Sequence, residues 1–154
     1  MHCAYHVDTA EKLMPAMDLL IDTIAKKIAQ YHGVVKTGRT HLMDAMPLTI
    51  DQELGAWNTQ LLNARTSLIT VLDALRFLPQ GGTAVGTGIN AHPRFAREFC
   101  KAISPLVGFK AETSNDYFRN LSSQDLSVQL SGELKNLAVI LMKISNDLRW
   151  MNSG

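Results

Sequence analysis

The chain has 154 residues, with 15 Lys and Arg against 14 Asp and Glu and a formal net charge of +1. This length fits one domain with a sizeable core, since folding at this size hides roughly 68–70% of the extended-chain surface. The balanced charge gives no electrostatic footprint for nucleic acid or for an acidic membrane surface, so we expect no partner of either kind.

Several features predict a soluble protein in a reducing compartment. No stretch approaches the ~20 apolar residues that span a bilayer, and the N-terminus lacks a basic flank followed by an apolar run. Cys3 and Cys100 have no paired spacing, which favours free, buried thiols over a disulfide or a zinc site. We expect a cytoplasmic location, with the mitochondrial matrix as the alternative.

The first periodic segment covers residues 9–31 and predicts a long helix. Its apolar face is formed by Leu13, Met17, Leu20, Ile24 and Ile28. We expect the helix to close at residues 32–33, where glycine supplies a C-terminal cap, and to tolerate Pro15 only near a first turn or as a kink.

Residues 36–49, KTGRTHLMDAMPLT, carry more polar chemistry than a connection of about 2–8 residues requires. We expect a loop that presents Thr40 and His41. Histidine acts as an acid or base near neutral pH, and a threonine hydroxyl binds a carboxylate or orients the ring. Arg39 offers a planar cation to an anionic substrate or to Asp44. From spacing alone, satisfied loop polar groups remain the commoner interpretation.

A second long helix is predicted over residues 50–78. Thr49 and Gln52 form a capping box before it, and Pro79 ends it. Such a helix is roughly 44 Å long. A compact globule of this mass has a radius of gyration of only ~15 Å, so the helix would extend beyond it. Its apolar stripe consists of Leu54, Trp57, Leu61, Ala64, Leu68, Leu72 and Leu75.

The next stretch, residues 79–93, is too rich in glycine to be regular. Residues 86–91 match the dinucleotide pattern GxGxx[G/A], but that pattern requires a preceding strand and none is legible. The glycines are better explained by backbone angles that let the loop pass close to a neighbouring chain or ligand. We expect a shorter helix over residues 94–103, opened by Pro93, and then a connector over residues 104–113.

A third long helix is predicted near the C-terminus. Its stripe consists of Leu126, Leu130, Leu134, Leu137, Leu141, Ile144, Leu148 and Met151. No useful period-two alternation appears, so the expected fold class is all-α: a bundle of three long helices with one short helix and a glycine-rich loop. The apolar stripes exceed what three helices cover, which predicts self-association.

His2 and His6, with Cys3 alongside, would place two possible metal ligands on one helical face. No third or fourth ligand follows at a sensible spacing. Ordinary surface or packed histidines are therefore the favoured interpretation, and we expect no metal site.

Three motifs carry a resemblance to a known family. Residues 38–54, GRTHLMDAMPLTIDQEL, resemble a signature of the fumarase/aspartase superfamily. Residues 81–96, GGTAVGTGINAHPRFA, and residues 141–154, LMKISNDLRWMNSG, are similar to later segments of class II fumarases, in the correct order. Aspartases usually carry glutamine where this chain has His41, whereas fumarases carry histidine. The resemblance therefore favours class II fumarase.

The resemblance implies reversible hydration of fumarate to L-malate, without metal or organic cofactor, in a homotetramer with a central helical bundle. Thr40 would bind a substrate carboxylate, and His41 would activate or position the added water. Residues 1–154 resemble the central helical domain only; the family's earlier Ser-Gly-Thr and Ser-Ser-Asn segments and its later serine-containing catalytic loop are not in this sequence. We therefore expect the isolated chain to be inactive. Alternatives are an aspartase-type lyase segment and a non-enzymatic helical assembly domain.

Overall fold

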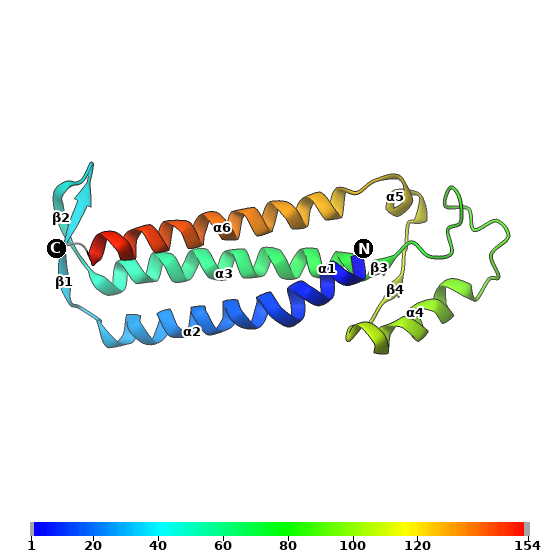
Figure 1. Cartoon of the computed structure of the whole chain (residues 1–154), viewed down its shortest axis with the longest axis horizontal. Coiled ribbons are helices and arrows are strands. Elements are labelled where there is room, and N and C mark those ends of the chain that lie inside the picture. Colours follow the sequence, from blue (N-terminus) through cyan, green and yellow to red (C-terminus); the bar gives the residue numbers. More distant parts are fainter. Residues whose placement is uncertain (1, 153–154) are drawn as a thin grey trace. The chain divides into compact units, whose positions relative to one another are not determined.

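A computed structural model of the protein describes residues 2–152, apart from the side chain of His2. The fold is mainly helical and contains two small two-stranded sheets (Figure 1). The chain divides into two compact units. One is built around Ser67–Leu134 together with the first turns of the chain, and the other combines Pro15–Thr66 with the chain from Lys135 onward.

The N-terminal helical stretch consists of α1 (His2–Asp8), a π-helical turn η1 (Thr9–Leu13) and α2 (Met14–Gln30). The π turn ends two residues before Pro15, whose missing N–H and ring interrupt the regular α-helical hydrogen bonding. Met14, Met17, Ile21 and Ile24 are buried. The helix gives way to Gly33 in the left-handed region, with a φ of 73°, which confirms the predicted end of this segment.

The segment that was expected to be a loop is a β-hairpin of β1 (Val35–Thr40) and β2 (Met43–Thr49). The expectation of an all-α chain without strands is therefore wrong at this point. Most hairpin residues are exposed on both faces. Because no face of the hairpin is buried, its sequence lacks the apolar alternation that usually reveals a strand.

Helix α3 (Ile50–Leu75) begins where the capping box predicted. The Thr49 backbone N–H donates to Gln52 Oε1 at 3.0 Å, the reciprocal bond of that motif. The predicted stripe is confirmed as core, since Leu61, Leu68 and Leu75 are fully buried. The helix ends three residues earlier than predicted, because residues 77–78 pair with another strand.

The unit around Ser67–Leu134 contains a parallel pair of short strands, β3 (Phe77–Leu78) and β4 (Glu112–Thr113). Its further helices are α4 (Phe95–Val107) and α5 (Tyr117–Ser122). Leu78, Cys100 and Ala111 form a small core cluster in this unit. Helix α4 passes Pro105 and ends at Val107, four residues beyond the predicted end, and the left-handed Gly108 caps it.

Glycines shape the long loop before α4. Gly86 has a φ of 106°, and a Cβ atom there would lie 2.9 Å from the Phe118 ring. The N–H groups of Gly86 and Gly88 both donate to the Gly82 carbonyl at 3.0 Å. These glycines allow close backbone approach, as expected, but Gly82 and Gly86 approach α5 of the same chain and not the neighbouring chain or ligand that was expected.

Helix α6 (Asp125–Met151) contains two apolar rows rather than one. Leu126, Leu130, Leu137 and Ile144 are buried. The other members of the predicted stripe are exposed to between 38% and 51%: Leu134, Leu141, Leu148 and Met151. Assigning all eight positions to the core was therefore wrong for this second row. No helix in the described part of the chain is long and apolar enough to cross a membrane.

Candidate functional site

The register of the hairpin determines where its tip points. Thr37 pairs with Pro47 and Arg39 pairs with Asp44, so that two residues of β2 lie opposite the single residue Gly38. This is a β-bulge, which bends a hairpin and increases its twist. A Cβ atom at Gly38 would lie 2.4 Å from the Met46 carbonyl oxygen, so only glycine fits at this position.

His41 and Leu42 form the two-residue turn between the paired residues Thr40 and Met43. Both have positive φ angles, 53° for His41 and 60° for Leu42, as in a type I′ turn. Such turns normally use Asn-Gly, because a Cβ atom disfavours left-handed backbone. Non-glycine residues held there carry strain on the order of 1–3 kcal/mol each. The chain therefore presents His41 on a strained turn.

The base of the hairpin is fastened to the start of α3. The Ile50 N–H donates to the Val34 carbonyl at 2.9 Å, and Asp51 accepts from the Gly33 N–H at 3.2 Å. His32 Nδ1 lies 3.1 Å from the same carboxylate. Hydrogen bonding, chiefly from the Thr49 side chain and then from Gly33, holds the pKa of Asp51 below its usual value. These contacts anchor both strands of the hairpin.

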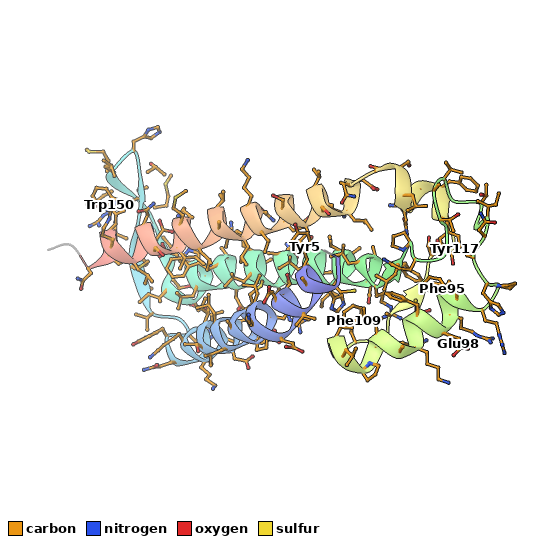
Figure 2. The ribbon with its side chains drawn as sticks, turned by 45° about the vertical axis from the view of Figure 1, so that its right-hand side comes forward. Tyr5, Phe95, Glu98, Phe109, Tyr117 and Trp150 are labelled. Atoms are coloured by element: carbon orange, nitrogen blue, oxygen red, sulfur yellow. The ribbon has the colours of Figure 1, made fainter. Side chains whose placement is uncertain are left out.

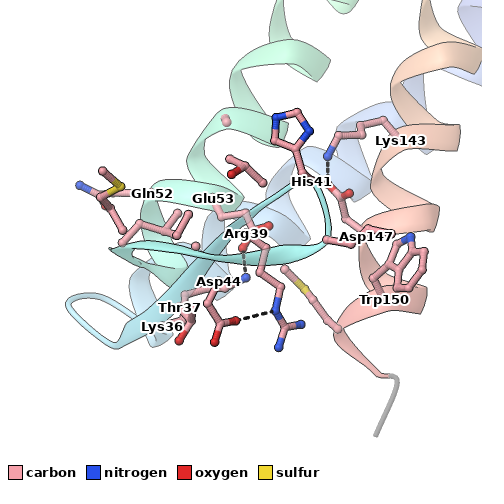
Figure 3. Close-up of a pocket in the computed structure, with 18 residues that line it drawn as sticks. Lys36, Thr37, Arg39, His41, Asp44, Gln52, Glu53, Lys143, Asp147 and Trp150 are labelled. Atoms are coloured by element: carbon pink, nitrogen blue, oxygen red, sulfur yellow. Dashed lines mark hydrogen bonds and ion pairs between the residues drawn. The ribbon is translucent and has the colours of Figure 1, made fainter.

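A large open pocket of about 1280 Å³ lies against the hairpin (Figure 3). The hairpin, the first turns of α3 and the last turns of α6 supply its lining. Thr40 and His41 both line this pocket and both are exposed. Within the part of the chain that the structure describes, neither side chain has a hydrogen-bond or ion-pair partner. The two predicted residues thus lie together at the pocket.

Three ion pairs surround the pocket (Figure 3). Arg39 Nε lies 3.6 Å from Asp44 Oδ1, which fits the alternative in which Arg39 serves a structural carboxylate. The other two pairs join Lys36 to Glu53 and Lys143 to Asp147. The charges are balanced pairwise, so the pocket is polar without a strong net sign.

Sequence reasoning missed the four lining residues of α6: Lys143, Asp147, Trp150 and Met151. The sequence indicates that these residues lie on a helix, but nothing in it indicates that they lie near the hairpin, about a hundred positions earlier in the chain. This juxtaposition depends on tertiary packing, which leaves no local signal.

The other candidate motifs do not form sites. Residues 86–91 lie in an irregular loop with no strand directly before them and no helix starting within them, so the dinucleotide pattern lacks its structural context. His6 stacks on Phe109 with ring centroids 3.9 Å apart (Figure 2 labels Phe109), and burial is the main cause that lowers its pKa. His6 is therefore a packed histidine, whereas the side chain of His2 lies outside the described residues.

No group of three or more His, Cys, Asp or Glu side chains within the described chain is arranged to hold a metal ion. Cys3 and Cys100 are both free thiols; Cys100 is buried, as expected, whereas Cys3 is only partly buried. Burial is the main cause that raises the pKa of Cys100. The side chain therefore stays a protonated thiol at neutral pH, which is less reactive than a thiolate.

The sequence and the fold match one class of protein. The chain belongs to the Lyase family, whose model matches residues 1–154. It is 51% identical over its whole length to "Fumarate hydratase class II 2" of Pseudomonas aeruginosa and covers 34% of that protein. It is 52% identical to "Fumarate hydratase class II" of Xylella fastidiosa strain Temecula1, over 93% of this chain and 30% of the relative.

A solved structure supports the same grouping. The crystal structure of the recombinant class II fumarase from Schistosoma mansoni has a TM-score of 0.91 and 32% sequence identity. The match covers 100% of this chain and 35% of that one. The resemblance inferred from the three sequence motifs is therefore confirmed, and the chain spans about a third of the length of the curated relatives that it matches.

Proposed function

We propose that this chain is the central helical segment, residues 1–154, of a longer fumarate hydratase that adds water reversibly to fumarate to give L-malate. The longer polypeptide is called the parent protein below. One observation carries the proposal: a member of the Lyase family exposes Thr40, at the end of β1, next to His41, in the strained hairpin turn, at a pocket. The similarity to class II fumarate hydratases at 51% and 52% identity supports the choice of reaction.

Thr40 and His41 have complementary roles in this proposal. The Thr40 hydroxyl donates to a substrate carboxylate, and the His41 imidazole activates or positions the water that is added. Removing a proton beside a carboxylate builds up negative charge, which preorganised donors and cations must stabilise. Histidine is the side chain that most often serves as a general acid or base in enzymes. The proposal includes no metal and no organic cofactor.

The site is composite in this proposal. The described chain supplies a threonine and a histidine but no serine base and no further anion-binding loop at the pocket. We propose that other parts of the parent protein and neighbouring copies supply them. The exposed row Leu134, Leu141 and Leu148 on α6 gives an apolar surface for a helical bundle between copies, here a homotetramer. A cytoplasmic or mitochondrial-matrix location, without nucleic-acid or membrane partners, belongs to the same proposal.

The experiment is an assay of the parent protein and of the 154-residue chain with fumarate and water. We expect the parent protein to form L-malate and the isolated chain to form none. L-malate formation by the isolated chain would refute the composite site. A parent protein without any hydration of fumarate would refute the function.

Further measurements distinguish the proposed hydratase from an aspartase-type lyase and from a non-enzymatic assembly domain. An aspartase-type lyase would consume fumarate only when ammonium is present, and His41 argues against it because aspartases usually carry glutamine there. A non-enzymatic assembly domain would neither bind a fumarate analogue nor restore activity when mixed with complementary fragments of the parent protein.

A further inference from the structure

Leu42 combines two unfavourable features in one residue. Its backbone lies in the left-handed region with a φ of 60°, and its apolar side chain is 75% exposed. A two-residue turn of this kind normally places glycine at its second position. Neither the exposed methyl groups nor the strained backbone stabilises the chain described here. Local violations of this sort gather where function requires them.

The position of Leu42 connects this strain to His41. Thr40 and Met43 are a register pair, so only His41 and Leu42 link the two strands. With only two residues in the turn, the backbone angles of Leu42 and His41 must fit each other for the turn to close. Leucine allows only a narrow left-handed well, whereas glycine populates positive and negative φ alike. Leu42 and His41 also line the same pocket.

We propose that Leu42 is a positioning residue for His41. Because the Thr40–Met43 pair closes the turn, the Cβ atom of Leu42 leaves few backbone conformations open, and this restriction holds the imidazole at the pocket wall. The strain is retained because a relaxed turn would let His41 move. The catalytic meaning of this role rests on the proposed function, whereas the restriction itself is a property of the hairpin and is measured without any substrate.

The first test measures backbone motion of the 154-residue chain by ¹⁵N relaxation. We expect the His41 amide of the wild type to have an order parameter of about 0.85, the value of rigid backbone, and that of Leu42→Gly to fall below about 0.6. The melting temperature of Leu42→Gly should not fall, since glycine removes the left-handed strain. Leu42→Asn, which keeps a Cβ atom and tolerates this backbone, should leave His41 rigid. An order parameter near 0.85 for His41 in Leu42→Gly would overturn the proposal.

Thr83 provides a matched control. It is another exposed non-glycine residue with positive φ, 56°, and it lies outside the pocket. Thr83→Gly should relieve its own strain and leave the His41 order parameter unchanged. A fall in that order parameter in Thr83→Gly would mean that a glycine elsewhere in the chain also makes the hairpin mobile. The effect of Leu42→Gly would then not be specific, and the proposed role of Leu42 would be refuted.

The second test measures kinetics of the parent protein. Leu42→Gly should lower kcat about tenfold or more while KM changes by less than about twofold, because a misplaced catalytic group impairs the transition state more than substrate binding. Leu42→Asn should retain most of the activity. If kcat is unchanged in Leu42→Gly although the turn has become mobile, Leu42 does not position His41. A wild-type parent without hydratase activity would contradict the proposed function, and the relaxation result would still decide the role of Leu42.

Discussion

Arg39 and Asp44 face each other across the hairpin, with Arg39 Nε 3.6 Å from Asp44 Oδ1. Only the pair Thr40–Met43 separates them from the turn. Because both side chains are largely exposed, at 66% and 80%, we expect the ion pair to contribute little to stability.

Asp44→Asn should therefore change the free energy of unfolding by less than about 1 kcal/mol at low salt. At about 1 M salt, where the screening length is about 3 Å, the difference from wild type should vanish. Urea denaturation at the two salt concentrations measures both values. A loss above about 2 kcal/mol that persists in high salt would show that the hairpin depends on this contact far more than a surface pair allows.

Arg65 of α3 holds Asp18 of α2 by two hydrogen bonds, of 2.5 Å from Nε and 3.2 Å from Nη2. Hydrogen bonding to Arg65 lowers the pKa of Asp18 in the folded state. A carboxylate with a lowered folded pKa stabilises the fold above its unfolded pKa of about 3.9 and loses this contribution as pH falls through the folded value.

Asp18→Asn should accordingly melt at a lower temperature than the wild type at pH 5–7, by an amount that does not vary within this range. The two melting curves should converge as pH falls below about 3.9, because wild-type Asp18 then becomes protonated. A gap that widens on acidification would have the opposite sign and would contradict the assigned ion pair.

Gly86 and Gly33 provide a matched pair for testing the glycine loop. Both have positive φ, 106° for Gly86 and 73° for Gly33. A Cβ atom at Gly86 would lie 2.9 Å from Phe118, whereas a Cβ atom at Gly33 would have no other atom within 4 Å. Gly33→Ala should cost only left-handed strain of about 1–2 kcal/mol. Gly86→Ala should cost about 1–3 kcal/mol more, because the added methyl group also overpacks the site. Equal denaturation midpoints for the two variants would show that Phe118 does not confine the loop.

The regular helices follow from the sequence because their signals are local. The start of α3 depends on Thr49 and Gln52, three residues apart, and its core face on apolar residues at successive turns. The end of α3 was placed three residues too late. The helix ends early because Phe77 pairs with Glu112, 35 positions later in the chain. No local sequence pattern predicts such a contact.

The candidate site was predictable in its residues but not in its form. Thr40 and His41 stand out by residue type and by the family resemblance. Their hairpin was missed because its strands bury neither face, and the contribution of Trp150 was missed because it comes from a distant helix. The two apolar rows on α6 were predicted as a single core stripe. The helical spacing of leucines is the same whether this chain buries them or leaves them exposed.

Leu68 and Leu19 test the assignment of core and surface. Leu68 is fully buried on α3, whereas Leu19 on α2 is 71% exposed. Leu68→Ala should cost about 2–5 kcal/mol, the usual range for a buried leucine, and Leu19→Ala less than about 0.5 kcal/mol. Chemical denaturation measures both values. Similar losses for the two variants would mean that the face of α3 containing Leu68 is not a packed core.

The most direct measurement is the turnover of the parent protein with His41→Gln. His41 is exposed and unpaired within the described chain, so this change should leave the circular dichroism spectrum and the melting temperature unaltered. The variant His92→Gln, in the exposed glycine loop, serves as the control and should keep wild-type turnover. Our account predicts that His41→Gln lowers kcat for the hydration of fumarate by about 10²–10⁴-fold, the contribution of a general acid or base. An unchanged kcat in a folded His41→Gln protein would contradict it.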